Sequence, residues 1–295
     1  EPYRRQRQMC IRDRNMRELK LMVPAEFDGA EAQTFLKSRG FSRRALIRLK
    51  QTGGLTRGGA LLRTVDEVHC GEELCVRLSD DAESAEPNPE LNAPVIYEDE
   101  DVAVFDKPPH MPVHPSIRHR GDTLANLFAA LFPGLPFRPI NRLDRNTSGL
   151  CVCAKNQYAA SALSGSLSKV YFAVTCGTPP GDTVDAPIGR AGDSIITRCV
   201  TPEGQRAVTH FERVGGNDSH ALLKVALETG RTHQIRVHMA YIGFPLCGDE
   251  MYGGDMSGIK RHALHCGEVS FTQPVTKEII RLTSPLPADM SELIK

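Results

Sequence analysis

The residue types best suited to catalysis lie in one short segment, residues 141–149, which read Asn-Arg-Leu-Asp-Arg-Asn-Thr-Ser-Gly. Asp144 stands between Arg142 and Arg145, and positive charge on both sides favours the ionised carboxylate. An ionised carboxylate can act as a nucleophile or as a general base. Gly149 closes the segment and can adopt backbone angles that other residues avoid. For any three of these residues alone, the alternative is an ordinary surface turn with an Asp/Arg pair.

Two further segments carry side chains able to work with that carboxylate. A helix is expected from about residue 232 to residue 241, and Arg236 on it can project toward a carboxylate in the sheet. Residues 169–174 alternate like a strand and place Tyr171 on one face. An aromatic ring can stack on a nucleic-acid base, worth about 1–3 kcal/mol. A lone strand tyrosine more often belongs to the core.

A metal site is a weaker interpretation of the sequence. His262, His265 and Cys266 lie close together, but no second pair of ligands stands at a usual zinc spacing. His233 and His238 lack the glutamate of a zinc-protease helix. We therefore expect no metal ion.

Composition and the number and spacing of cysteines limit the classes of protein to which this chain can belong. The chain has 295 residues, 40% hydrophobic and 24% charged, which is typical of globular domains. No apolar run approaches the length of a membrane span, so we expect no membrane partner. Nine cysteines, none in a Cys-x-x-Cys pair, and no secretion signal predict reduced thiols and a cytoplasmic location.

Residues 1–15 stand apart from the rest of the sequence. They hold five arginines without the apolar core of a signal peptide. Met16 opens a segment that is coherent by itself, so we expect residues 1–15 to be non-native or disordered. A native basic tail that contacts RNA is the alternative.

The remaining sequence predicts two domains and a linker. Residues 16–79 predict a small α/β domain, with a helix over residues 30–38 and a second helix that begins after Ser42. Residues 16–63 hold ten basic residues against four acidic ones, a bias compatible with a polyanion or with an ordinary solvated face. Residues 80–93 are acidic and proline-bearing, which indicates a linker.

Residues 94–295 predict an α+β domain with a largely antiparallel sheet. Strands recur without a regular strand–helix rhythm, and one helix is expected to begin at Asp122. The strands are expected at residues 95–97, 102–105, 150–154, 170–176, 207–214 and 221–227.

The order of these segments resembles the RluA-type pseudouridine synthases. That family shows a Lys-Pro…His-Pro segment, then His-Arg-Leu-Asp-x-x-Thr-Ser-Gly, a Lys-x-Tyr strand and Gly-Arg-Thr-His-Gln-Ile-Arg-Val-His. Gly-Asp-x-x-Tyr-Gly and Leu-His follow, and spacing and order match over roughly residues 94–285. Residues 16–79 resemble, more loosely, the S4-like RNA-binding domain that many members carry. One departure is Asn141, where the family usually has histidine; an asparagine side chain still donates and accepts hydrogen bonds.

The resemblance implies a role for each matching residue. It makes Asp144 the catalytic aspartate, Tyr171 the ring that stacks on the target uracil, and Arg236 the partner of Asp144. It makes Arg142 the arginine that fills the gap left by the flipped nucleotide. The other substrate-binding residues that it implies are Leu264, Lys107 and His114.

The implied reaction isomerises specific uridines in structured RNA, with ribosomal RNA favoured over tRNA, by a monomer without a cofactor. Asp144 either attacks the anomeric carbon or removes the 2′ proton, and the sequence leaves both routes open. A non-catalytic RNA-binding ribosome-assembly factor on the same fold is the main alternative. A hydrolase using Asp144 and His114 is weaker, because no oxyanion motif or paired carboxylate accompanies them.

Overall fold

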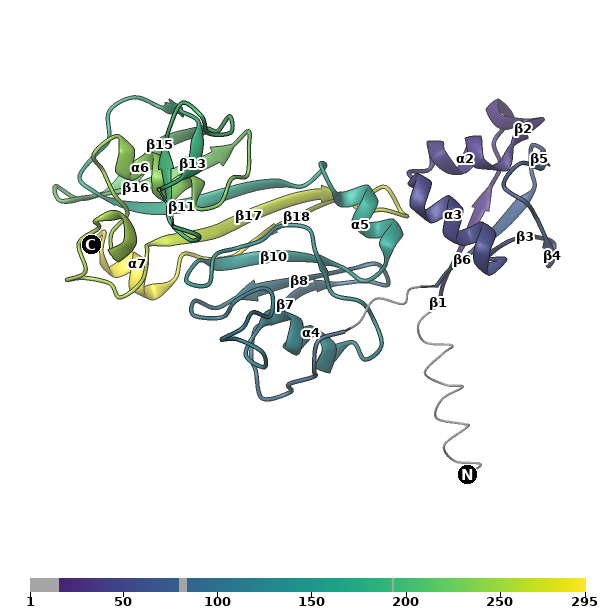
Figure 1. The fold of residues 1–295 in the computed structure, drawn as a ribbon, viewed down its shortest axis with the longest axis horizontal. Helices are drawn as coiled ribbons and strands as arrows, with labels where there is room; N and C mark the ends of the chain where they lie inside the picture. Colours follow the sequence, from purple (N-terminus) through teal and green to yellow (C-terminus); the bar gives the residue numbers. More distant parts are fainter. Residues whose placement is uncertain (1–15, 80–83, 193) are drawn as a thin grey trace.

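The computed structural model describes residues 16–79, 84–192 and 194–295, and its elements form two groups (Figure 1). The small group runs from Met16 to Ser79 and the large group from Val95 to Glu292. The expectation for residues 1–15 and the first four residues of the expected linker lie outside the described residues.

The small group is a four-stranded sheet with two helices. Its strand order is β1-β6-β3-β4, and all of its paired neighbours are antiparallel. The strands are β1 (Met16–Met22), β6 (Glu73–Ser79), β3 (Leu55–Arg57) and β4 (Ala60–Leu61), with β2 (Ala30–Glu31) and β5 (Glu67–Val68) paired separately. Helices α2 (Ala32–Ser38) and α3 (Arg43–Thr52) bury Phe35, Leu36 and Leu49 in a core of their own.

The boundaries of α3 follow from its sequence. Ser42 accepts a hydrogen bond from the Ala45 N–H at 3.2 Å, which confirms the predicted start of the helix. The helix ends at Gly53 in the left-handed conformation that glycine favours. Arg43, Arg44 and Lys50 stay exposed on the surface.

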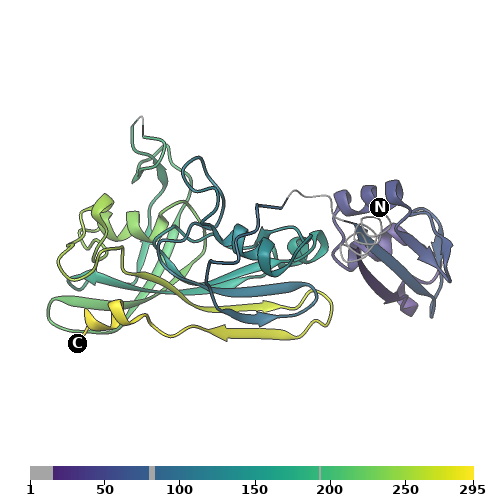
Figure 2. The same ribbon diagram turned by 90° about the horizontal axis from the view of Figure 1, so that it is seen from below.

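Tyr158 joins the small group to the large one. Its ring lies 4.6 Å from the Phe41 ring, and it belongs to the hydrophobic cluster of the small group. Its hydroxyl lies 3.0 Å from the Arg39 carbonyl and 3.1 Å from the Pro274 carbonyl. The small group therefore packs at one end of the large sheet, beside α5 (Gln157–Leu163), as Figures 1 and 2 show.

The large group is built on a ten-stranded sheet. Its main strand order is β12-β15-β16-β11-β17-β10-β8-β7, with β18 beside β17 and β9 beside β10. The strands are β7 (Val95–Glu98), β8 (Val102–Lys107), β9 (Arg138–Pro139), β10 (Ser148–Ala154), β11 (Ser168–Cys176), β12 (Thr183–Asp185), β15 (Val208–Gly216), β16 (His220–Leu227), β17 (Leu264–Thr272) and β18 (Ile279–Thr283). A separate hairpin pairs β13 (Ile188–Arg190) with β14 (Arg198–Val200). The predicted α+β class with a mainly antiparallel sheet is confirmed.

Strand β10 is a fully buried interior strand of this sheet. All seven of its residues are buried, which explains its continuous apolar run. It pairs antiparallel with β8, while its start pairs parallel with β17 through Ser148 and Gly149. The backbones approach so closely that a Cβ on Gly149 would lie 2.3 Å from the Cys266 carbonyl oxygen.

Helices α4 (Leu124–Leu131), α6 (Gln234–Tyr241) and α7 (Ala288–Glu292) complete the large group. The sequence suggested that α4 begins at Asp122, but Asp122 does not cap this helix. Thr123 does so, sharing a capping box with Asn126, and Asp122 binds His119 at 2.6 Å instead. No described helix is long and apolar enough to cross a membrane.

We predict that Gly149→Ala lowers the free energy of unfolding by about 2–4 kcal/mol, because its φ of 105° and the nearby Cys266 backbone both disfavour a Cβ. Thermal unfolding measures the effect. The matched control is Gly121→Ala, where a Cβ meets nothing within 4 Å. Equal melting temperatures for the two variants would contradict the prediction.

Candidate active site

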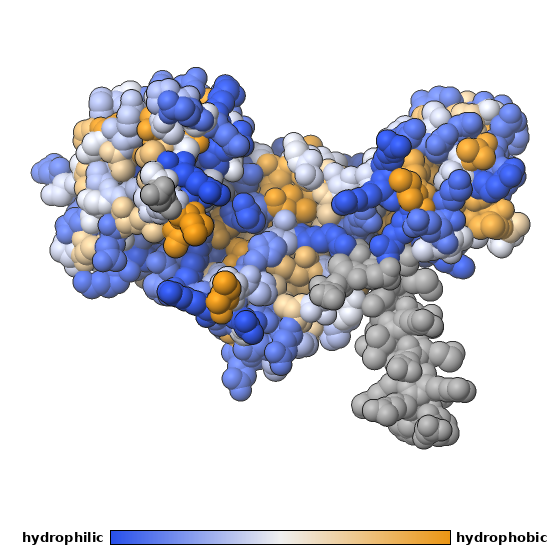
Figure 3. Space-filling view, in the orientation of Figure 1, coloured by the Kyte–Doolittle hydropathy of each residue, from blue (hydrophilic) through white to orange (hydrophobic). Residues whose placement is uncertain are grey.

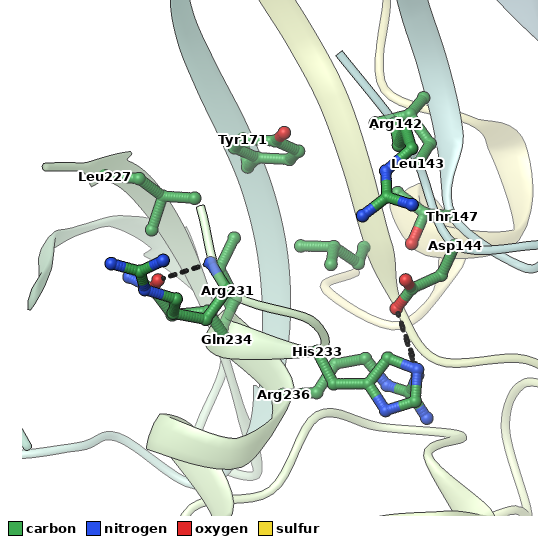
Figure 4. Close-up of a pocket in the computed structure, with 12 residues that line it drawn as sticks. Arg142, Leu143, Asp144, Thr147, Tyr171, Leu227, Arg231, His233, Gln234 and Arg236 are labelled. Carbon is green, nitrogen blue, oxygen red and sulfur yellow. Dashed lines mark hydrogen bonds and ion pairs between the residues drawn. The ribbon is translucent and has the colours of Figure 1, made fainter. Parts of the chain in front are cut away.

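Asp144 lies on the loop between β9 and β10, at the mouth of a cavity. The loop turns where the Thr147 N–H binds the Asp144 carbonyl at 3.0 Å. Asp144 is partly exposed, with 29% of its side chain accessible. Its carboxylate points toward His233 and Arg236, while Tyr171 and Leu227 lie across the cavity (Figure 4).

Asn141 attaches this loop to the sheet. Its amide donates to the Leu150 carbonyl at 2.9 Å and accepts from the Val152 N–H at 2.8 Å. The side chain thus pairs with β10 as a neighbouring strand would. The asparagine that departs from the family pattern donates and accepts, as the sequence analysis expected, and both partners belong to the protein backbone.

Arg236 makes the decisive ionic contact of the site. Its NH1 donates to Asp144 Oδ2 at 3.0 Å, so the predicted meeting of these two residues is found. Its Nε and NH2 donate to both oxygens of Asp249 at 2.7 and 2.8 Å. Arg236 is 6% exposed and Asp249 1% exposed, so this bidentate pair is shielded from water. Hydrogen bonds and charge from both carboxylates outweigh burial and raise the pKa of Arg236.

The two cations that flank Asp144 in the sequence lie differently from Arg236. Arg142 and Arg145 are exposed, and neither binds the carboxylate in the described contacts. Arg145 instead points NH1 toward His119 Nε2 at 3.5 Å. Of the three cations that sequence and resemblance put beside Asp144, Arg236 is the one in contact.

Tyr171 and Leu264 line the cavity beside Asp144. Its volume is about 70 Å³, and both side chains are almost fully buried. A bulge places Tyr171: Val170 pairs with Glu268 and Tyr171 with Cys266, so Gly267 is the extra residue on β17. Burial, together with the nearby Cys266 thiol and Asp144, raises the pKa of the Tyr171 phenol well above its usual value.

A wider cleft of about 670 Å³ opens in front of the cavity. Arg142 and His114 line it, where the sequence analysis expected substrate contacts. Among the described residues that line it, Asp144 is the only acid. The basic and imidazole side chains in its lining are His114, His119, Arg142, Arg145, Lys169, Arg231 and His233. The His114 ring packs edge-on against Phe137, and burial and the Arg142 charge lower its pKa.

Lys107, which the resemblance implied as a substrate contact, lies elsewhere. It is fully buried, and burial lowers its pKa to about 7. Its Nζ donates to the carbonyls of Pro108, Met111 and Arg145 at 2.8, 2.9 and 3.2 Å. The buried Lys107 side chain is held by three backbone carbonyls and does not line the cleft. It joins the loop after β8 to the loop that carries Asp144.

The histidines of the suspected metal cluster serve as hydrogen-bond partners. His262 Nε2 lies 2.8 Å from the Thr147 hydroxyl, and His265 Nδ1 lies 3.0 Å from the Ser148 hydroxyl. Burial and neighbouring cations lower the pKa of His262 to about 2, so its ring is neutral. Both histidines therefore hold the start of β10 against β17.

Three residues that had no predicted role lie at or near Asp144 in the structure: Asp249, His233 and Tyr252. The signal for two of them was present, since Asp249 and Tyr252 belong to the Gly-Asp-x-x-Tyr-Gly segment. Their spacing alone did not show that η2 (Glu250–Tyr252) packs on α6. His233 lies within the predicted helix segment but precedes its first turn.

Comparison with known proteins agrees with this fold. A family model described as RNA pseudouridylate synthase matches residues 101–241. "Uncharacterized RNA pseudouridine synthase YjbO" of Bacillus subtilis is 43% identical, over 87% of this chain and 95% of that protein. "Ribosomal large subunit pseudouridine synthase D" of Pseudomonas aeruginosa is 36% identical, over 86% of this chain and 87% of that protein. The solved structure of human RNA Pseudouridylate Synthase Domain Containing 1 matches with a TM-score of 0.55 and 26% identity, over 68% of this chain and 86% of that one.

These similarities and the site define an RNA-modifying isomerase. The chain belongs to the RluA-type family of RNA pseudouridine synthases. Its substrate is RNA.

We predict that Lys107→Met lowers the free energy of unfolding by about 1–3 kcal/mol, because three backbone carbonyls lose their donor. Turnover should fall as well, since one of these carbonyls belongs to Arg145, the neighbour of Asp144. RNA affinity should change little. Chemical unfolding, single-turnover rates and binding titrations measure the three quantities.

Lys169→Met is the matched control, because Lys169 lines the cleft. It should weaken RNA binding and leave stability near wild type. The opposite pattern, with Lys107→Met losing affinity but keeping its stability, would restore Lys107 as an RNA contact.

Proposed function

We propose that this enzyme isomerises a uridine of large-subunit ribosomal RNA to pseudouridine, with Asp144 as its catalytic residue. The observation that carries the proposal is the pairing of Asp144 with Arg236 at the mouth of a cavity that Tyr171 and Leu264 line. The ribosomal substrate is inferred from relatives named as large-subunit enzymes.

The geometry of the carboxylate supports a single reacting oxygen. The contacts from Arg236 and His233 both fall on Oδ2. No described residue hydrogen-bonds Oδ1, which leaves that oxygen able to react. The charge-assisted bond from Arg236 occupies Oδ2, so the second oxygen is the one available to attack.

Two routes are consistent with that oxygen. In the first, Oδ1 bonds to C1′ as the C1′–N1 bond breaks, and the uracil leaves with the electron pair. After the uracil turns, C5 bonds to C1′, the Oδ1–C1′ pair returns to the carboxylate, and C5 loses its proton. In the second, Oδ1 removes the 2′ proton as the C1′–N1 bond breaks and the uracil leaves with that electron pair, which gives a glycal. After the uracil turns, C5 bonds to C1′, the proton returns to C2′, and C5 loses its own proton. Both require the nucleotide to leave its stack, at a cost of a few kcal/mol.

The cleft supports the remaining roles. Tyr171 is proposed to stack on the uracil while it turns, and Leu264 to close the apolar side of the cavity. Arg142, exposed at the rim, is proposed to fill the gap left by the flipped nucleotide. His114 and the basic side chains of the cleft face the flanking phosphates. Lys107 is proposed as a positioning residue.

The small group of elements is proposed to be an S4-like RNA-binding domain over residues 16–79. Its exposed arginines on α3 support phosphate contacts. Figure 3 shows a hollow between this unit and the large one, with hydrophilic side chains along its walls. Residues 80–93 then form the linker and residues 94–295 the catalytic domain. We further propose that the enzyme is a cytoplasmic monomer that needs no cofactor and no metal.

We predict that Asp144→Asn abolishes turnover while RNA affinity and melting temperature stay close to wild type. The substitution is nearly isosteric and removes the anionic oxygen that either route requires. Tritium release from RNA labelled at C5 of uridine measures turnover. A folded Asp144→Asn protein that releases tritium at the wild-type rate would overturn the assignment. A wild-type protein that binds RNA but releases none would favour the non-catalytic alternative.

A second prediction concerns α3. Arg43→Gln with Arg44→Gln should weaken RNA binding and reduce the slope of log affinity against log salt by about 1.5, because two phosphate contacts are lost. The control is Lys20→Gln with Arg77→Gln, since these cations already pair with Glu73 at 3.6 Å and Glu18 at 3.0 Å. Identical salt slopes for the two double variants would remove the small domain from the RNA-binding surface.

A further inference from the structure

His233 has an unusual backbone position at the edge of the site. It precedes the first turn of α6 in the left-handed conformation, with φ 58° and ψ 19°. Few residues other than glycine adopt this conformation, and asparagine, aspartate and histidine are the most frequent of them. With this backbone conformation, the imidazole lies between Asp144 and Tyr252.

Hydrogen bonds on one side of the ring fix its tautomer. His233 Nδ1 lies 2.9 Å from the Tyr252 hydroxyl oxygen. That oxygen accepts the backbone N–H of Arg198 at 3.0 Å. The hydroxyl keeps one proton to donate, and Nδ1 is the acceptor within reach, so this network assigns the ring proton to Nε2.

The protonated side of the ring faces the carboxylate. His233 Nε2 lies 3.8 Å from Asp144 Oδ2, the oxygen that Arg236 also binds. This distance exceeds a hydrogen bond, and such contacts commonly tighten when substrate binds. A short shift of the partly exposed Asp144 side chain brings Oδ2 within hydrogen-bond distance of His233 Nε2.

Burial favours the neutral form of the His233 ring. Burial is the main cause that lowers the His233 pKa, and the cations Arg236 and Arg198 act in the same direction. Asp144 and Asp249 oppose this shift without reversing it. The neutral His262 ring completes the surroundings. A neutral imidazole with a fixed tautomer is a directed donor, and it leaves the negative charge of Asp144 in place.

We propose that His233 is a positioning residue that donates its Nε2–H to Asp144 Oδ2, with its tautomer set by Tyr252. Arg236 alone leaves the carboxylate able to rotate about Cβ–Cγ, a torsion with broad minima. A second donor on the same oxygen stops that rotation and keeps Oδ1 directed into the cavity. This inference rests on the proposed role of Asp144.

Two substitutions of His233 separate this role from a purely structural one. Asparagine suits the left-handed backbone, but its amide reaches only as far as Nδ1. Glutamine suits that backbone less well, and its amide reaches as far as Nε2 and supplies an N–H there. His233→Asn should therefore be the more stable variant and His233→Gln the more active one. Stability and activity should rank the two in opposite order.

The expected size of the effect follows from lost alignment. His233→Asn should lower kcat about ten- to hundredfold with little change in KM. His233→Gln should recover most of kcat. Turnover is measured by tritium release in the full-length protein, and stability by thermal unfolding. Equal kcat for the two variants, or activities that follow their melting temperatures, would refute the inference.

Tyr252→Phe tests the tautomer. It keeps the ring beneath the Arg236 guanidinium, which lies 5.0 Å from the ring centre, and removes the hydroxyl. In the wild-type background kcat should fall, because the imidazole can then place its proton on either nitrogen. In the His233→Gln background the same change should have no further effect, since an amide has no such tautomer. Equal losses in both backgrounds would show that the hydroxyl has only a structural role.

A wrong catalytic assignment of Asp144 and a wrong role for His233 give different results in these experiments. An Asp144→Asn protein with wild-type activity would refute the catalytic assignment whatever the His233 variants do. An inactive Asp144→Asn protein combined with equal His233→Asn and His233→Gln activities would refute only the role of His233.

Discussion

The site depends on one guanidinium, that of Arg236, which two carboxylates share. Burying a charged group costs several kcal/mol unless a partner compensates it. Asp249 provides the compensation through two short bonds, and both members of that pair are almost inaccessible to water. Because Nε and NH2 both bind Asp249, the plane of the guanidinium is fixed. Its NH1 is then directed toward Asp144. The buried pair of Arg236 and Asp249 thus fixes the direction in which Arg236 donates to Asp144.

This arrangement brings together three segments that lie far apart in the chain. Asp144 comes from the loop before β10, Arg236 from α6 and Asp249 from the turn before η2. The β9–β10 loop is held independently from the sheet side, where Asn141 pairs with the β10 backbone and Lys107 binds the Arg145 carbonyl. Because these contacts are made to backbone atoms, they fix the path of the loop and leave its side chains available to the cleft. The family's usual histidine is therefore not required at position 141 for that anchoring.

The sequence predicted the parts of this structure that local patterns determine. The apolar run of β10, the alternation of β11 and the serine cap of α3 each appear where expected, because hydrophobic patterns and helix caps can be recognised in short stretches of sequence. The contact of Arg236 with Asp144 followed from the family resemblance, since the two residues are 92 positions apart. Asp249 lay in a recognisable motif, but the sequence did not show that Arg236 is its partner, because that pairing depends on the packing of η2 on α6.

Two expectations about residues at the site failed for reasons that also concern packing. The helix expected from about residue 232 begins at Gln234, because His233 takes a left-handed conformation that helix periodicity cannot reveal. Lys107 is in a motif with charged and polar neighbours, which made an RNA contact a natural expectation. The structure buries it beneath the loop instead, where its three donors meet three carbonyls. Distinguishing a lysine that binds phosphate from one that binds backbone requires knowing which side of the strand end faces the cleft.

The net charge of zero conceals the electrostatic organisation that this chemistry needs. Part of the acidic stretch between residues 64 and 106 is engaged far from the cleft, where Asp101 binds both Arg17 and Asn156 and Asp99 accepts the Tyr97 hydroxyl. The cleft is left with cations and histidines around a single described acid. A polyanionic substrate is attracted by the rim, while the one anion in the lining would repel its phosphates if it stood alone. The contact with Arg236 offsets that repulsion between the Asp144 carboxylate and the phosphates. The same guanidinium therefore holds one oxygen of the carboxylate and makes its charge compatible with the substrate.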